Sequence, residues 1–175
     1  MRLTTKLLSA LILGALTSTA MASTASAQVD PNGVYVLKSQ FRGTGECLEG
    51  NQKAGSYNGA AVMLNCGPAT GQQWRFVPQG GGYYKLKTVF RGDGECLEGN
   101  QATSSYKNGS AFMDTCRNVS GQLWKLVPAG GGHYRLKTQF RGDGECFESG
   151  SSQTRAFMDN CKNVSGQFWK IERIR

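Results

Sequence analysis

Acidic side chains beside the cysteines are the residues best placed to do chemistry in this sequence. Glu46 lies one residue before Cys47 and Glu49 two residues after it, and the arrangement occurs three times. Two carboxylates could serve as the acid and the base or nucleophile of a glycoside hydrolase. A separation of three along a strand places them on opposite faces, however, so we do not expect them to act as a pair. Glu46 and its equivalents Glu95 and Glu145 are predicted to be solvated turn residues, and the equivalents of Glu49 are Glu98 and Glu148.

Other groups able to carry out a reaction are few. A nucleophilic triad needs a histidine that an acid orients. The only histidine, His133, aligns with Tyr83 of the preceding copy and so occupies a variable strand position. The sequence also lacks a phosphate-cradling loop and the clustered ligands of a metal site. It therefore predicts a protein that is not an enzyme and that holds no cofactor and no metal.

A repeated turn accounts for the Arg-Gly-Asp tripeptide at residues 91–93, which animal adhesion receptors read. The same segment, F-R-G-x-G-E, begins at Phe41, Phe90 and Phe140, and its first copy has Thr44 in place of the aspartate. Two glycines that flank a polar residue between two strands have the composition of a hairpin turn. We therefore interpret the segment as a turn and not as an adhesion site.

Three copies of one unit make up most of the chain. Trp74, Trp124 and Trp169 are 50 and 45 residues apart, a period that indicates supersecondary units burying their apolar faces against one another. Residues 83–90 alternate in polarity like a strand with one covered face. The other strands predicted in that unit are 95–100, 110–116 and 122–128, the last ended by Pro128. Four short strands per unit predict an all-β barrel or sandwich, closed by threefold repetition.

The six cysteines fall two to a unit. Of the possible pairings, only the one within each unit repeats identically and stays local. A zinc site is the alternative, but one histidine and the wide cysteine spacing do not match the usual ligand pairs. The predicted disulfides are Cys47 with Cys66, Cys96 with Cys116, and Cys146 with Cys161.

Residues 1–27 have the order of a secretory signal peptide. Arg2 and Lys6 precede an apolar run that is too short to span a bilayer, and small-x-small sites place cleavage after residue 27 or after residue 22. The rest, residues 28–175, is the length of one domain. It holds 18 basic and 12 acidic residues, a net charge of +6 that is too dispersed for a nucleic-acid-binding tail. We expect a secreted protein, periplasmic if the host is a Gram-negative bacterium, that has no membrane span and is a monomer.

The segments "CLEGN...LNCGPATGQQW", "CLEGN...DTCRNVSGQLW" and "CFESG...DNCKNVSGQFW" give the sequence a family resemblance. Their C-L-E, second cysteine and Q-x-W resemble the repeat of the ricin B-type (R-type) lectins, which are β-trefoils. The resemblance covers essentially all of residues 33–174. It implies a six-stranded barrel capped by three hairpins, with the three tryptophans in the core. The lobes would span about residues 33–78, 79–128 and 129–175.

The resemblance also implies a shallow sugar pocket in each lobe. The family has an acidic residue third in its C-L-D motif, an aromatic residue two before the second cysteine, and Asn-Gln at the start of Q-x-W. Here glutamate fills the first place, Leu64, Asp114 and Asp159 fill the second, and Gly71, Gly121 and Gly166 replace the asparagine. Only the acidic class and the glutamine are retained.

Loop residues could replace the missing contacts. A sugar needs an aromatic face for its C–H groups and carboxylate or amide partners for its hydroxyls. Tyr57 and Tyr106 lie in the loops after C-L-E, where they bind sugar or cover the disulfide, whereas the third loop is about five residues shorter and has no tyrosine. Asp114 and Asp159 could accept from a ligand or cap loop amides, and we favour the structural role. The predicted ligand-binding residues are Glu49, Tyr57, Asn58 and Gln72 in lobe one, Glu98, Tyr106, Asn108, Asp114 and Gln122 in lobe two, and Glu148, Asp159 and Gln167 in lobe three, the poorest expected binder.

Two functions fit these features. The first is a secreted, non-catalytic lectin-like protein that binds glycans or polysaccharides through several weak sites. The second is a disulfide-stapled trefoil that binds another protein without sugar, as an inhibitor or the targeting subunit of a toxin. Neither nucleic acid nor a membrane is an expected partner.

Overall fold

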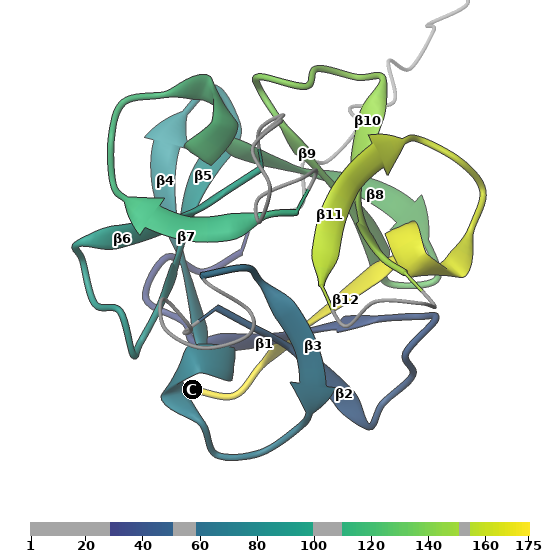
Figure 1. Ribbon diagram of the computed structural model, residues 1–175, viewed down its shortest axis with the longest axis horizontal. Helices are drawn as coiled ribbons and strands as arrows, with labels where there is room; N and C mark the ends of the chain where they lie inside the picture. The colour runs from purple at the N-terminus through teal and green to yellow at the C-terminus, as the bar shows by residue number, and fades with distance from the viewer. Residues whose placement is uncertain (1–28, 51–58, 100–109, 151–154) are drawn as a thin grey trace, which may run out of the picture.

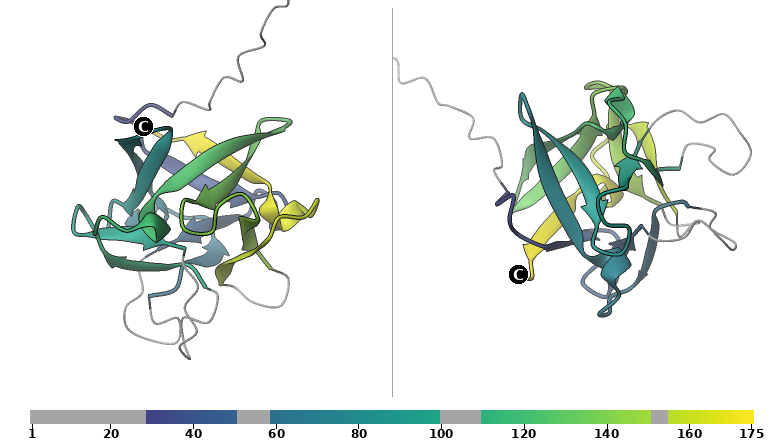
Figure 2. Two further views of the ribbon diagram at one scale, coloured as in Figure 1. Left: turned by 90° about the horizontal axis from the view of Figure 1, so that it is seen from above. Right: turned by 90° about the vertical axis from the view of Figure 1, so that its left-hand side faces the viewer.

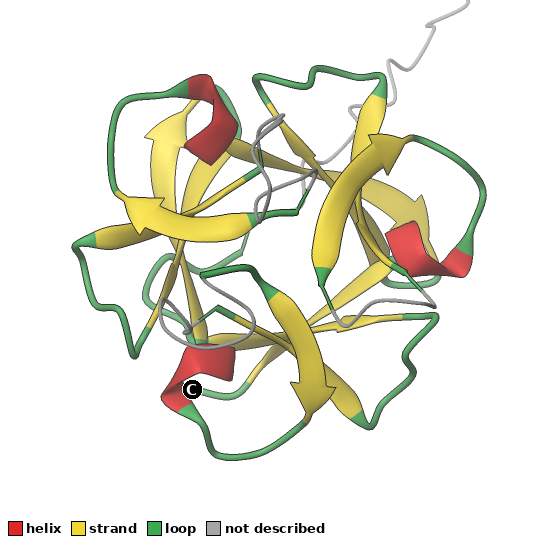
Figure 3. Cartoon of the chain, viewed as in Figure 1, coloured by secondary structure: helices red, strands yellow, loops and turns green. Residues whose placement is uncertain are grey.

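The computed structural model describes residues 29–50, 59–99, 110–150 and 155–175. Within these ranges the chain forms twelve strands and three 3₁₀ turns. The strands are β1 (Tyr35–Ser39), β2 (Glu46–Glu49), β3 (Val62–Asn65), β4 (Trp74–Gly80), β5 (Tyr83–Thr88), β6 (Glu95–Glu98), β7 (Phe112–Thr115), β8 (Trp124–Gly130), β9 (His133–Thr138), β10 (Glu145–Ser149), β11 (Ala156–Asn160) and β12 (Trp169–Arg173). The 3₁₀ turns are η1 (Thr70–Gln72), η2 (Ser120–Gln122) and η3 (Ser165–Gln167), one in each lobe (Figure 3).

The strands form a barrel and a cap. Six strands close an antiparallel barrel in the order β1-β12-β9-β8-β5-β4. The hairpins β2–β3, β6–β7 and β10–β11 surround the centre in the view of Figure 1 and lie beside the barrel in the side views of Figure 2. This architecture is a β-trefoil with pseudo-threefold symmetry and confirms the predicted fold. We call β1–β4, β5–β8 and β9–β12 lobes one, two and three.

Strand β5 shows the alternation that the sequence predicts. Tyr84, Leu86 and Thr88 are buried, whereas Lys85 and Lys87 on the other face are only partly buried. The prediction that Pro128 ends its strand is wrong, because β8 continues to Gly130. The pairing register of β8 with β9 shifts between Pro128 and Gly130, and such an irregularity admits a proline that cannot donate to the ladder.

The three Q-x-W tryptophans are fully buried, as the resemblance implied. Each indole Nε1 donates to the backbone of the same lobe's first hairpin strand, so the buried donor is satisfied. The glycine that follows the C-L-E motif leaves room for this packing. A Cβ on Gly50 would lie 2.6 Å from Trp74 and 2.8 Å from Met113 Sδ of the next lobe. The indole bonds run from Trp74 to Leu48 O (2.9 Å), Trp124 to Leu97 O (2.8 Å) and Trp169 to Phe147 O (2.8 Å).

A closed ring of backbone hydrogen bonds joins the hairpins at the pseudo-threefold axis. The amide of Ala61 donates to Ala111 O (2.7 Å), that of Ala111 to Ala156 O (2.9 Å), and that of Ala156 to Ala61 O (2.8 Å). All three alanines are fully buried. Each lobe therefore holds the other two in register, and the position has room only for a small side chain.

Each lobe contains one disulfide, which confirms the predicted pairing. The bonds close loops with sequence separations of 19, 20 and 15 residues. A loop of this length stabilises the fold by about 3 kcal/mol in the chain-entropy estimate. The bonded pairs are Cys47–Cys66, Cys96–Cys116 and Cys146–Cys161.

The F-R-G-x-G-E segments are turns between strands, as predicted. Gly92 has a φ of 60°, a left-handed conformation that favours glycine, and Thr88 Oγ1 accepts from the amide of Arg91 (3.1 Å). The prediction that the glutamates here are solvated is wrong. The carboxylate of Glu95, at the start of β6, accepts two hydrogen bonds from Arg91. Glu145 pairs with Arg141 in the same way, and Glu46 Oε1 lies 3.6 Å from Arg42 Nη1.

Ion pairs neutralise the lysines beside these turns. Asp93 Oδ1 accepts from Lys87 (3.2 Å) and Arg75 (3.1 Å), and these contacts, the Lys87 hydrogen bond first, lower the pKa of Asp93. Lobe one has Thr44 at the aspartate position. There Lys38 instead donates to Glu172 of β12 (2.7 Å), which lowers the pKa of Glu172.

Replacing an axial alanine tests the hydrogen-bonded ring. We expect Ala111→Val to lower the free energy of unfolding by about 1–3 kcal/mol, because added methyl groups overpack the axis and press the other two hairpins apart. Denaturant unfolding measures the change. Ala129→Val is the control, since Ala129 is a partly exposed residue of β8, and an equal loss in both variants would contradict a special role for the axis.

Candidate functional site

A carboxylate and an amide form the same braced pair in each lobe. In lobe one, Gln72 Nε2 donates to Glu49 Oε2 (2.9 Å) and to Asn65 O (3.0 Å), while Gln72 Oε1 accepts from the amide of Gly67 (3.0 Å). The glutamine thus ties the strand that carries the glutamate to the end of β3. Gln122 Nε2 donates to Glu98 Oε2 at 2.9 Å in lobe two, and Gln167 Nε2 to Glu148 Oε2 at 2.7 Å in lobe three.

The predicted glutamine ligands are committed to this brace. Gln72, Gln122 and Gln167 are buried, and both ends of each amide are bonded inside the protein. Their side chains therefore position the glutamate and are not oriented towards a ligand. The sequence pattern showed that the glutamine was retained but not which of its atoms were already bonded.

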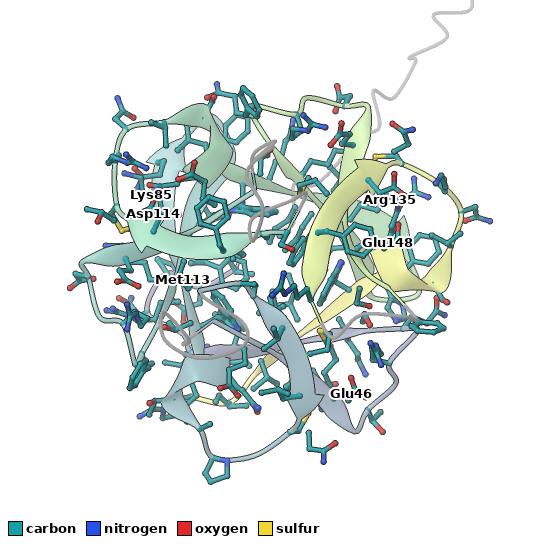
Figure 4. The ribbon with its side chains drawn as sticks, viewed as in Figure 1. Glu46, Lys85, Met113, Asp114, Arg135 and Glu148 are labelled. Carbon is teal, nitrogen blue, oxygen red and sulfur yellow. A yellow bond between two sulfur atoms is a disulfide. The ribbon has the colours of Figure 1, made fainter. Side chains whose placement is uncertain are left out.

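The three glutamates differ in exposure. Glu49 and Glu98 are 6% and 4% exposed, whereas Glu148 is partly exposed. Of the two carboxylate oxygens of Glu148, Oε2 accepts from Gln167. Oε1 has no hydrogen-bond partner in the part of the chain that the structure describes. Glu148 is therefore the carboxylate best able to accept from an external hydroxyl. Figure 4 labels it in lobe three, away from Asp114 of lobe two.

Glycine stands at the family's asparagine position for a steric reason. A Cβ on Gly166 would lie 2.5 Å from Ser149 O and 3.1 Å from Glu148 Cγ. A side chain there would collide with a backbone carbonyl, and moving that carbonyl would disturb the strand. The glutamate, one methylene longer than the family's aspartate, lies against the space that this glycine leaves open. The two departures from the family pattern thus occur together.

The predicted aspartates are paired with neighbouring cations. Asp114 Oδ2 accepts from Arg117 Nη2 at 2.7 Å, and Asp159 Oδ2 from Lys162 Nζ at 2.9 Å. The other oxygen of each accepts from the amide of the next residue at 2.8 Å. Both oxygens of each aspartate thus have partners inside the protein. Lobe one has no counterpart, since Leu64 stands at the aspartate position and Gly67 at that of the cation.

The pair in lobe three shifts both pKa values. The hydrogen bond from Lys162 is the main cause that lowers the pKa of Asp159, and the same contact raises the pKa of Lys162. Glu148 adds a smaller attraction to Lys162. Because the pKa of Asp159 is depressed on folding, the pair stabilises the protein above the unfolded-state pKa, and this contribution is lost as pH falls through the folded-state value.

A shallow pocket of about 250 Å³ lies beside Glu148. Its walls include Gly150, Val164 and Gly166 of lobe three and Phe41, which belongs to the turn after β1 in lobe one. Phe41 was not among the predicted ligands. The sequence did contain a signal, since each copy of F-R-G-x-G-E keeps a phenylalanine in a turn that has no core to fill.

Some predictions concern parts of the chain outside the description. Tyr57, Asn58, Tyr106 and Asn108 lie outside the described residues. In the described ranges no helix has the length and apolarity needed to cross a membrane. Nor does this part of the chain bring together three or more His, Cys, Asp or Glu residues that could hold a metal ion.

The ion pair of lobe three yields a prediction for titration. We expect the carboxyl group of Asp159 to titrate below the usual aspartate range in NMR spectra, and Lys162→Met to raise its pKa towards that range. Asp93→Asn, remote from this pair in sequence and lobe, is the control and should leave the Asp159 titration unchanged. An Asp159 pKa that is the same with and without Lys162 would contradict the pairing.

Comparison with solved structures shows the fold in several settings. The designed threefold-symmetric protein ThreeFoil has a TM-score of 0.62 and 27% identity, over 81% of this chain and 99% of that one. SeviL, in a structure bound to the asialo-GM1 saccharide, has a TM-score of 0.59 and 15% identity, over 82% and 98%. An exo-β-1,3-galactanase from Clostridium thermocellum has a TM-score of 0.64 and 21% identity, over 84% of this chain but only 31% of the enzyme.

The family is established by sequence. Comparison with curated protein sequences gives no match. The family model described as "Ricin-type beta-trefoil lectin domain-like" matches twice, over residues 24–111 and 70–155. Because these overlapping matches cover well over half of the chain and the structure is a β-trefoil, the chain belongs to the ricin-type β-trefoil lectin-like family.

Proposed function

We propose that this chain is a secreted, non-catalytic carbohydrate-binding protein. The observation that carries the proposal is the partly exposed carboxylate of Glu148, held by Gln167 at the edge of a pocket. Membership of a lectin-type family supports it. The saccharide complex of SeviL is a further reason to test glycans, since SeviL has the same fold.

The brace prepares Glu148 to bind a hydroxyl. Gln167 holds Oε2, which leaves Oε1 as the acceptor, and hydrogen bonds to an ionised carboxylate are stronger than neutral ones. A side chain that is already fixed loses little conformational entropy on binding. These features suit a sugar with a hydroxyl group directed at the pocket wall.

The absence of catalysis is part of the proposal. The other glutamate of β10, Glu145, is bound to Arg141, while Glu148 is bound to Gln167. Because the two carboxylates have separate partners, they do not form the facing pair that a glycosidase uses.

Secretion and multivalency extend the proposal. The signal-like residues 1–27 and the three disulfides suit an oxidising compartment. The threefold repeat offers up to three related positions on one molecule, which differ in the exposure of their glutamate. Engaging more than one of them on a polysaccharide would raise the avidity above that of any single weak site.

A second candidate function, protein binding without sugar, has its own support. Glu49 and Glu98 are almost fully buried, and Asp114 and Asp159 are neutralised by cations. Lobes one and two thus present little free sugar-binding chemistry among the described residues. Retention of a protein partner that excess free sugar does not release would favour this alternative.

A glycan array with the oxidised protein tests the main proposal. The sequence alone ranked lobe three last, but its exposed carboxylate leads us to expect the largest effect from Glu148→Gln. We predict at least a tenfold loss of affinity, because a charge-assisted hydrogen bond to the ligand is removed without changing the size of the side chain. Glu49→Gln and Glu98→Gln are the matched controls, and their signals should fall less.

Two results would count against the proposal. An oxidised, folded protein that gives no signal with any neutral, amino-substituted or anionic glycan would reject carbohydrate binding. Equal losses in all three glutamate variants would reject Glu148 as the principal acceptor.

A further inference from the structure

Three exposed phenylalanines remain unexplained by the fold. Phe41, Phe90 and Phe140 are 45%, 56% and 52% exposed, and they occupy the same position in the three turns. A large apolar side chain in water does not stabilise a core. Its presence on the surface is informative when it adjoins polar groups that could bind a ligand.

Each phenylalanine is attached to the lobe before its own. The amide of Phe41 donates to Ser165 O (3.2 Å) in the 3₁₀ turn of lobe three. Phe90 is bonded in the same way to Thr70 of lobe one, and Phe140 to Ser120 of lobe two. Each phenylalanine turn is therefore anchored to the lobe before it, with lobe one following lobe three, and Phe41 lines the pocket beside Glu148.

The junction between lobes one and three has an additional contact. Arg42 lies over the Phe41 ring at 5.7 Å from its centroid, as Arg91 and Arg141 lie over the phenylalanines before them, but Arg42 also donates to Gly150 O (2.8 Å), two residues beyond Glu148. Arg91 and Arg141 have a different principal partner, since each makes two hydrogen bonds with the glutamate four residues on. Arg42 thus links the turn of Phe41 to the end of the strand that carries Glu148.

We propose that Phe41 and Glu148 form an inter-lobe sugar subsite, with Phe41 as its aromatic platform. A hexose would place its C–H face on the exposed part of the Phe41 ring and a hydroxyl or amino group at Glu148 Oε1. Val164, which is also exposed, would contact the sugar from the side. This inference rests on the proposed carbohydrate-binding function and supplies the aromatic contact that the family position, occupied by Asp159, does not.

The pocket restricts the class of sugar. Its volume of about 250 Å³ is below the roughly 300–1,000 Å³ of pockets for drug-sized ligands, so it suits one sugar ring. A carboxylate at the contact point repels a uronic or sialic acid carboxylate and favours neutral or amino-substituted hexoses. The subsite should therefore prefer galactosamine and galactose to galacturonic acid, in spite of the positive net charge of the chain.

Variants of the phenylalanines test the subsite. With galactose, galactosamine and galacturonic acid as probes in NMR titrations, and with the best glycan of the array in calorimetry, we expect Phe41→Ala to weaken binding about tenfold. Phe41→Tyr should bind within about twofold of the unchanged protein, because it keeps the ring. Phe140→Ala is the matched control, since its amide is bonded to the 3₁₀ turn of lobe two, where Glu98 is buried, and it should also stay within about twofold.

The controls separate this inference from the proposed function. Thermal unfolding should show that Phe41→Ala is folded, as expected for an exposed side chain. If Glu148→Gln weakens binding and Phe41→Ala does not, the protein binds sugar but the inter-lobe platform is wrong. A preference for galacturonic acid, or equal losses in Phe41→Ala and Phe140→Ala, would also overturn it. If no glycan binds the unchanged protein, the proposed function and this subsite fail together.

Discussion

The cap of this trefoil depends on the hydrogen-bonded ring of Ala61, Ala111 and Ala156. Each amide finds its acceptor in a different lobe, so no lobe can satisfy its own axial backbone alone. A buried amide without a partner costs about 1–3 kcal/mol. The three hairpins must therefore assemble together. Gly50 and Gly99, which follow the two C-L-E motifs, reinforce this dependence, because a Cβ at either would collide with a tryptophan of its own lobe and a methionine of the next.

The candidate site is built on the same supports. The strand that carries Glu148 also carries Phe147, whose carbonyl accepts the indole N–H of Trp169 and whose ring stacks on that indole. The glutamine brace then fixes the carboxylate from the opposite side. A rigid core thus sets the direction of an acceptor at the surface, while the aromatic group comes from a turn on the adjoining lobe. The carboxylate and its glutamine belong to one repeat, whereas the aromatic ring belongs to another.

The sequence predicted those features that follow from period and composition. Three such features are the alternation in β5, the cysteine pairs and the buried tryptophans. Each follows from a sequence pattern that occurs in all three repeats. Features that depend on which side-chain atoms come into contact in the folded chain could not be predicted from the sequence pattern. The sequence does not show that both ends of the Gln72 amide are hydrogen-bonded within the protein. Nor does it show that the Glu95 carboxylate is bonded to Arg91 rather than to water. The ranking of the lobes changed for the same reason, since exposure of Glu148 is a property of the folded surface.

The substitution of Thr44 for an aspartate shows how such a repeat can diverge. In lobe two Asp93 neutralises Lys87 from within the turn, whereas in lobe one Glu172 neutralises Lys38 from the strand alongside. The charge balance is preserved although the residue that provides it has moved. The buried core residues are shared by all three repeats. At the surface, by contrast, the residue that neutralises a lysine can lie in the turn of one repeat and in a neighbouring strand in another. A protein of this design can keep one architecture while its three surfaces become specialised for different ligands.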